Sequence, residues 1–122
     1  MELMQTSKKI EEKIKTLELG RDILKEYAKN KAETISNYEK QMAIVLIRLK
    51  NGSEFDLEGE KIKNPPASIM EKIAKGVCFK EKLDMELAEA QYKNAIVGMG
   101  AIEAELNGYQ SINRFLSHTT EE

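Results

Sequence analysis

The stretch IEEKIKTLELGRDILKEYAKNKAETISNYEKQMAIVLIRL, residues 10–49, decides the fold. Alternating steps of four and three residues reach twelve positions, of which ten are apolar and two, Arg21 and Lys31, are basic. This spacing is typical of a helix that lies along another helix. We predict one helix over 7–50. Because propensity alone does not stabilise so long a helix, it needs a partner along its length.

The rest of the chain supplies that partner. A connector over 51–64 carries turn residues and ends at Asn64-Pro65-Pro66, which marks the start of a helix. We predict a second helix over 65–117 and a flexible tail over 118–122, with Gly98–Gly100 and Asn107–Gly108 as two places where the helix would break. Its seam is Ala74, Cys78, Glu81, Met85, Ala88, Tyr92, Ala95, Met99, Ile102, Leu106, Tyr109, Asn113 and Leu116.

A second apolar line runs beside this seam, and it bears on assembly. One stripe suffices for a single partner helix, so a broader, alanine-rich face indicates more than one partner. The sequence therefore predicts an all-α fold with one domain over 1–122, a coiled-coil-like antiparallel two-helix hairpin. We expect this hairpin to form a four-helix bundle dimer or a larger oligomer. The line consists of Leu83, Leu87, Ala90, Val97, Ala101 and Ala104.

The register of the hairpin follows from its closed end. If Leu49 lies near residues 67–69, the numbers of facing residues sum to about 118. A competing interpretation makes residues 43–58 a β-hairpin that turns at Asn51-Gly52, since Asn-Gly favours the type I′ turn. The unbroken heptad favours helix up to Leu49, which leaves Phe55 and Leu57 as a short extended piece of the connector.

Composition excludes several classes of protein. The net charge is −2, divided as +3 over residues 1–50 and −5 over residues 51–122, whereas proteins that depend on phosphate attraction usually carry a basic excess. One cysteine permits no internal disulfide. The longest apolar run, residues 42–47, is too short to cross a membrane. We expect a cytoplasmic protein without a membrane contact.

Catalytic and metal-binding patterns are missing from the sequence. The one histidine, His118, lies in a polar tail that would not hold catalytic geometry. Cys78 lies on the apolar seam and reads as a packing residue. The acidic run from Glu54 to Glu60 lacks the spacing of a calcium loop and reads as a solvated connector. We predict a protein that is not an enzyme and has no metal or cofactor.

The two basic seam residues give the most specific lead to a ligand. A cation that faces an apolar seam requires an anionic partner. Glu103, Glu105, an acid of another subunit or the phosphate of a ligand would each serve. In the predicted register Arg21 faces the neighbourhood of Gly98. A salt bridge that fixes the register is the plainer interpretation. The candidate ligand set is Arg21, Lys31, Tyr92, Asn94, Gly98 and Gly100.

A small basic edge offers a nucleic-acid alternative. Its residues are interleaved with glutamates, as on an ordinary solvated helix surface, which makes nucleic acid the less favoured partner. The edge consists of Lys8, Lys9, Lys13 and Lys15.

Three blocks of the second helix resemble known sequences: KIAKGVC at 72–78, AEAQYKN at 88–94 and AELNGYQSINRFL at 104–116. They are similar to small helical proteins encoded by phages and prophages of Firmicutes. The resemblance covers mainly residues 62–116 and implies a phage origin in a host cytoplasm. It implies no residue roles.

Together these features predict a non-enzymatic binding protein. It would interfere with a host process, such as defence, by binding a partner protein or an anionic small ligand such as a nucleotide signal. One alternative is an accessory protein of phage DNA recombination or replication. Another is a purely structural assembly factor.

Overall fold

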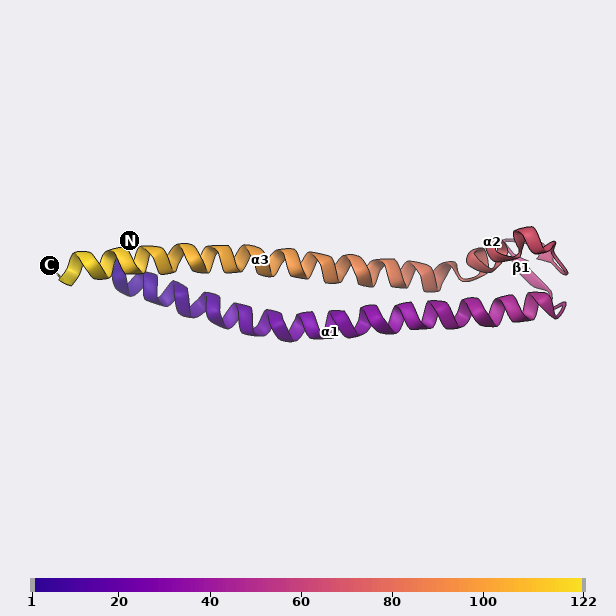
Figure 1. The fold of residues 1–122 in the computed structure, drawn as a ribbon, viewed down its shortest axis with the longest axis horizontal. Coiled ribbons are helices and arrows are strands. Elements are labelled where there is room, and N and C mark those ends of the chain that lie inside the picture. The colour runs from indigo at the N-terminus through magenta and orange to yellow at the C-terminus, as the bar shows by residue number, and fades with distance from the viewer. Residues whose placement is uncertain (1, 122) are drawn as a thin grey trace. The chain divides into compact units, whose positions relative to one another are not determined.

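The heptad-bearing stretch forms one continuous helix, α1 (Leu3–Lys50). The computed structural model describes the backbone of residues 2–121 and the side chains of residues 2–119. A short hairpin follows, with β1 (Phe55–Leu57) and β2 (Glu60–Ile62), and then two helices, α2 (Ala67–Val77) and α3 (Phe79–Glu121). The described chain is 85% helical, which confirms the predicted all-α hairpin class (Figure 1).

The predicted turn at Asn51-Gly52 does not join two strands; it ends α1. Gly52 adopts φ +85°, its N–H donates to Leu49 O at 3.2 Å, and the N–H of Ser53 donates to Arg48 O at 2.9 Å. This pair of bonds is the Schellman arrangement, in which a glycine in the left-handed region closes a helix. The competing interpretation of a β-hairpin over 43–58 is therefore excluded, and the predicted helix up to Leu49 is confirmed.

The strands pair further along the connector. β1 and β2 are antiparallel with Phe55 opposite Ile62, and the turn lies at Glu58-Gly59, where both residues have positive φ. The carboxylate of Asp56 accepts a 2.8 Å hydrogen bond from the N–H of Gly59 and stabilises this turn. The prediction that Phe55 and Leu57 are extended is confirmed.

The second helix breaks where no signal predicts it. α2 ends at Val77, and Cys78 follows as its C-cap, with its N–H donating to Ala74 O at 3.0 Å. The helix then continues as α3 through the predicted break points at Gly98–Gly100 and Asn107–Gly108 and reaches Glu121, beyond the expected end at 117. Glycines lower helix propensity but do not block helical φ and ψ, so packing along the seam overrides them.

Contacts group the chain into two compact units, one formed by Met1–Ala28 with Gln91–Glu122 and the other by Lys29–Ala90. We call them the open-end unit and the hairpin unit. The hairpin unit holds a core of buried residues, Val45, Leu49, Ala74 and Cys78. Phe55 and Ile62 of the strands pack against it, and Figure 1 shows β1 and α2 beside the last turns of α1.

The open-end unit pairs the start of α1 with the end of α3 in antiparallel order. A Cβ on Gly20 would lie 3.5 Å from Met99 Cγ, Lys13 pairs with Glu105, and Ser7 Oγ lies 3.5 Å from Asn113 Oδ1. The residue numbers of these pairs sum to 118–120, as the sequence predicts. The thirteen predicted seam residues of the second helix are all buried or half-buried.

Candidate functional site

The open-end unit has a groove between α1 and α3 beside Arg21, which we call the Arg21 groove. Its volume is about 520 Å³. Successive turns of α1 supply most of its wall, and α3 supplies the aromatic ring of Tyr92. The groove is lined by Glu18, Arg21, Asp22, Leu24, Lys25, Ala28 and Tyr92.

The groove brings together only two residues of the predicted ligand set, Arg21 and Tyr92. Asn94, Gly98 and Gly100 are exposed and do not line it, while the half-buried Lys31 belongs to the hairpin unit. The expectation that Arg21 faces a dry seam is wrong. Its long side chain reaches solvent, as arginines at helix surfaces usually do, and an exposed cation requires no fixed anion.

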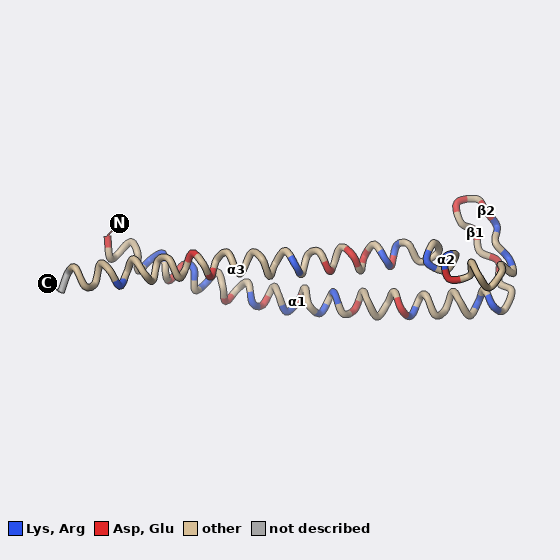
Figure 2. Tube along the Cα trace, turned by 45° about the horizontal axis from the view of Figure 1, so that its top comes forward, with Lys and Arg blue, Asp and Glu red and all other residues tan. Residues whose placement is uncertain are grey.

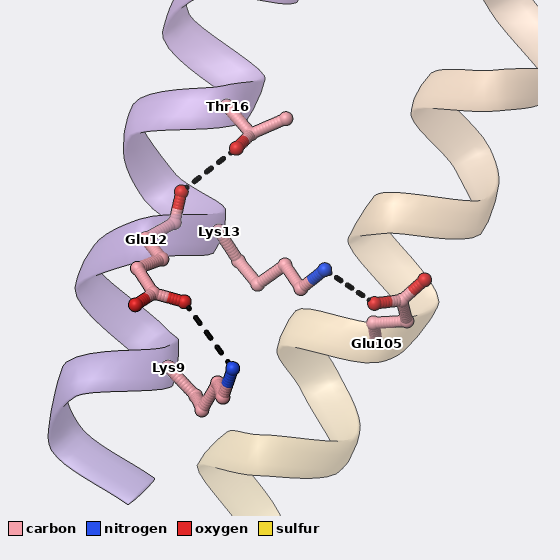
Figure 3. A network of polar contacts seen from close by, with 5 residues as sticks. All are labelled: Lys9, Glu12, Lys13, Thr16 and Glu105. Atoms are coloured by element: carbon pink, nitrogen blue, oxygen red, sulfur yellow. Dashed lines mark hydrogen bonds and ion pairs between the residues drawn. The ribbon is translucent and has the colours of Figure 1, made fainter. Parts of the chain in front are cut away.

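The basic edge near the N-terminus is partly neutralised by acids. Lys9 Nζ lies 3.5 Å from Glu12 Oε2, and Lys13 pairs across the helices with Glu105 (Figure 3). The hydrogen bond to Glu105 raises the pKa of Lys13, which stays charged at neutral pH. Charges of both signs alternate along α1 in Figure 2, so the edge is no continuous cationic stripe.

Both helices of the open-end unit carry exposed apolar side chains, and Met4 and Leu19 of α1 are 71% and 66% exposed. Val97 is 72% exposed and Phe115 is 69% exposed. Both fall on the side of α3 that the seam leaves free, which we call the outer face of α3. It consists of Asn94, Val97, Ala101, Ala104, Gly108, Ser111 and Phe115, which follow one another in steps of three and four and are all exposed.

The second apolar line predicted from the sequence includes part of this face. All six residues of the second apolar line are exposed, so none packs within the hairpin. The sequence prediction stopped at Ala104 and missed Phe115 and the neighbouring Ile112, which is 41% exposed. Continuing the same steps past Ala104 would have reached Phe115, because the heptad does not stop at the polar residues between them.

Glycines in this region have no packing role within the chain. A Cβ built on Gly98, Gly100 or Gly108 would meet nothing within 4 Å. Glycine inside a helix costs about 1 kcal/mol relative to alanine. By contrast, a Cβ on Gly76 of α2 would lie 3.2 Å from Leu57 Cδ2, so that glycine admits the close approach of β1.

The hairpin unit has a smaller groove of about 400 Å³ beside the strands. Phe79, which is 58% exposed, contributes to it, and Lys80 Nζ lies 6.0 Å from the centre of the Phe79 ring. Cys78 is buried, and burial raises its pKa. A buried neutral thiol packs and does not act as a nucleophile, in agreement with the sequence reading of Cys78.

Within the described part of the chain, no group of three or more His, Cys, Asp or Glu side chains is placed to hold a metal ion. None of the helices over residues 2–121 combines the length and apolar character that crossing a membrane requires. Comparison with protein-family models, curated proteins and solved structures gives no match for this chain. The resemblance to phage proteins therefore stays a prediction.

Proposed function

We propose that the protein is a non-enzymatic binding protein that contacts another protein through the outer face of α3. The observation that carries this proposal is the exposure of Val97 and Phe115, at 72% and 69%, on one face of one helix. Val97, Ala101 and Ala104 follow one another on this face, and a contiguous apolar patch left in water commonly marks a protein-binding surface. A long helix that offers such a face suits a partner helix laid along it.

The charge distribution supports the same proposal. Residues 94–102 contain no charged residue, and only Glu103 and Glu105 are charged between 94 and 113. The last part of α3 is accordingly mostly tan in Figure 2. Solvated helix faces usually carry charge, and depletion of charge is characteristic of the centre of protein interfaces.

The histidine and cysteine side chains give little support for catalysis. His118 is exposed on α3, and the Cys78 thiol is buried with a raised pKa. Neither offers the pairing of a nucleophile with an oriented base that covalent catalysis requires. These observations favour a protein that binds a partner and catalyses no reaction.

An anionic small molecule in the Arg21 groove is the second candidate, favoured by Arg21, Lys25 and the aromatic ring of Tyr92 in its wall. Glu18 and Asp22 balance the two cations, which weakens this candidate. Thermal-shift measurements with nucleotides and cyclic nucleotides test it. A shift that disappears in Arg21→Gln would support this candidate, and no shift at millimolar nucleotide would contradict it.

The main proposal is tested with a photo-crosslinking amino acid at Val97, in an extract of the cells that produce the protein. The matched control carries the same amino acid at Glu11, an exposed position of α1. We expect a protein adduct at Val97 that is absent at Glu11 and is lost in the Phe115→Asp background. Equal labelling at both positions, or no adduct at Val97, would contradict the proposal. A host protein as partner would fit the phage resemblance, and the mass of the adduct identifies it.

A further inference from the structure

We propose that Asn51-Gly52, at the end of α1, is a site of spontaneous covalent modification. Asn51 converts to aspartate and isoaspartate there, while the same dipeptide in α3, Asn107-Gly108, stays intact in the folded chain. Asparagine is among the chemically labile residues. It reacts most readily before glycine, because glycine has no side chain to hinder the approach of its backbone nitrogen. The chain contains this dipeptide at these two places.

The reaction requires only the chain itself and water. The backbone nitrogen of Gly52 loses its proton and attacks Cγ of Asn51, and the side-chain amide leaves as ammonia. The product is a cyclic imide, a succinimide, that joins the two residues. Water then opens one of the two carbonyl–nitrogen bonds of the ring. One opening gives aspartate, and the other gives isoaspartate, in which the backbone runs through the former side chain. Each product adds one carboxylate to a chain whose net charge is −2.

The backbone, and not solvent access, distinguishes the two sites, since Asn51 and Asn107 are both exposed. Gly108 lies well inside α3, so its nitrogen can reach the asparagine side chain only if a helix that continues on both sides unwinds. Gly52 lies beyond the last residue of α1, and its N–H donates one hydrogen bond of 3.2 Å, to Leu49 O. Because helix ends open at lower cost than helix interiors, the attack is easier at Asn51.

The cap of α1 requires the same glycine that makes Asn51 reactive. Gly52 has φ +85°, which residues with a side chain rarely adopt, and a Cβ there would lie 3.2 Å from Asn64 Oδ1. Gly108 is under neither restraint, because it lies within the helix and a Cβ on it would meet nothing within 4 Å. The labile dipeptide at the end of α1 is therefore a consequence of how that helix is closed.

Modification of Asn51 acts on the core of the hairpin unit. Isoaspartate lengthens the backbone by one methylene between Leu49 and Gly52, which disturbs the hydrogen bond that joins them and the bond from Ser53 N–H to Arg48 O. The new carboxylate also lies at the C-terminal end of a helix, where the helix dipole disfavours negative charge. Leu49 is 1% exposed and belongs to the same core as Cys78, so the modified cap lets this core open more often.

Ageing of the full chain at mildly alkaline pH tests the proposal. Peptide mapping by mass spectrometry measures the conversion of each asparagine, and enzymatic methylation identifies isoaspartate. We expect Asn51 of the folded chain to convert at least ~10-fold faster than Asn107. The chain unfolded in urea is the matched control, because both dipeptides are then free of helix and should convert at similar rates.

The effect on the core is measured on the aged chain after ion exchange has separated the form with the extra negative charge. We expect Cys78 of this form to be alkylated several-fold faster than Cys78 of the unmodified chain. Asn51→Asp is the matched control, since it adds the same charge without lengthening the backbone, and its rate should lie closer to that of the unmodified chain.

Two results would overturn the proposal. One is equal conversion of Asn51 and Asn107 in the folded chain, which would mean that position in the helix does not control the reaction. The other is an Asn51 that stays unchanged in the folded chain while it converts in urea, which would mean that the cap is as closed as a helix interior. Alkylation of Cys78 at the unmodified rate would overturn the effect on the core alone.

Discussion

The hairpin unit and the open-end unit use the same heptad seam with different results. In the hairpin unit the seam residues Leu49 and Ala74 are 1% and 0% exposed, because α1 and α2 pack against each other and the strands pack against both. Among the described residues of the open-end unit, α1 packs on one side of α3, and Val97 and Phe115 on another side stay in water. How fully the seam residues are buried therefore depends on the elements around them, because two paired helices cover only one face of each other.

The two regions therefore have different roles: the hairpin unit stabilises the fold, and the outer face of α3 is the proposed binding surface. The core of the hairpin unit buries its apolar side chains within the chain itself. The outer face of α3 offers apolar area that only another molecule can remove from water. Substitutions in the first region should change folding, and substitutions in the second should change association.

The largest effect is expected at Leu49. Leu49→Ala should lower the free energy of unfolding by about 2–5 kcal/mol, because it leaves a cavity at a fully buried site. Urea denaturation followed by circular dichroism measures this loss. Ile47→Ala, at a neighbouring position that is 60% exposed, is the control and should change stability by less than about 0.5 kcal/mol. Equal losses at both positions would show that the hairpin unit has no separate core.

The next effect is expected in the reactivity of Cys78. Because the thiol is buried, its alkylation requires the hairpin unit to open, and its native rate should be at least ~100-fold below the rate in urea. Timed labelling with iodoacetamide and mass spectrometry measures both rates. Rapid native labelling would mean that the core around Cys78 opens freely.

The same thiol makes stability depend on pH. Burial, and next the charge of Glu81, raises its pKa in the native chain above the ordinary value of 9.0. The native state then keeps a proton that the unfolded chain loses. This contribution is complete below pH 9 and falls as the pH rises further, whereas Cys78→Ala should remove the dependence.

A smaller effect, of opposite sign, is expected at Gly20 in the open-end unit. A Cβ there would lie 3.5 Å from Met99 Cγ, which is an ordinary contact, so Gly20→Ala should stabilise the chain by up to about 1 kcal/mol through helix propensity. Gly20→Leu should destabilise it, because the larger side chain would displace Met99. Thermal melts of both variants measure the two signs, and stabilisation by leucine would contradict this register.

The smallest effect on folding is expected on the outer face. Phe115→Asp should change the unfolding free energy of the dilute protein by less than about 0.5 kcal/mol, since the ring is 69% exposed. The same variant should lose the protein adduct that a photo-crosslinking amino acid at Val97 forms. A large loss of stability in dilute solution would show that Phe115 packs within its own chain.

Most of the fold could be predicted from the heptad, because spacing fixes which side of a helix is buried. The register of α1 against α3 could also be predicted, as the closeness of Gly20 to Met99 shows. A β-hairpin turning at Asn51-Gly52 stayed a competing interpretation, because Asn-Gly suits both a hairpin turn and a helix C-cap, and the hydrogen bonds of Gly52 and Ser53 distinguish them. The break at Cys78 was missed, because the nearby Gly76 lies inside α2 with helical backbone and no proline follows it.

The candidate site was less predictable. A seam position was taken to imply burial for Arg21, but a long side chain can leave the seam for solvent. Phe115 was missed because the predicted line ended at Ala104, and sequence patterns show which residues share a helix face but not whether that face is covered. The exposure of Phe115 in the folded chain supplies that information.

The central claim is that association covers the outer face of α3 and leaves the hairpin core unchanged. Hydrogen–deuterium exchange with and without the partner protein identified by the Val97 adduct tests it most directly. We predict that the partner raises the protection of peptides from residues 94–115, while protection of residues 42–49 and 67–78 stays constant. Protection of 94–115 that the partner does not change, or that rises equally in all three segments, would contradict the claim.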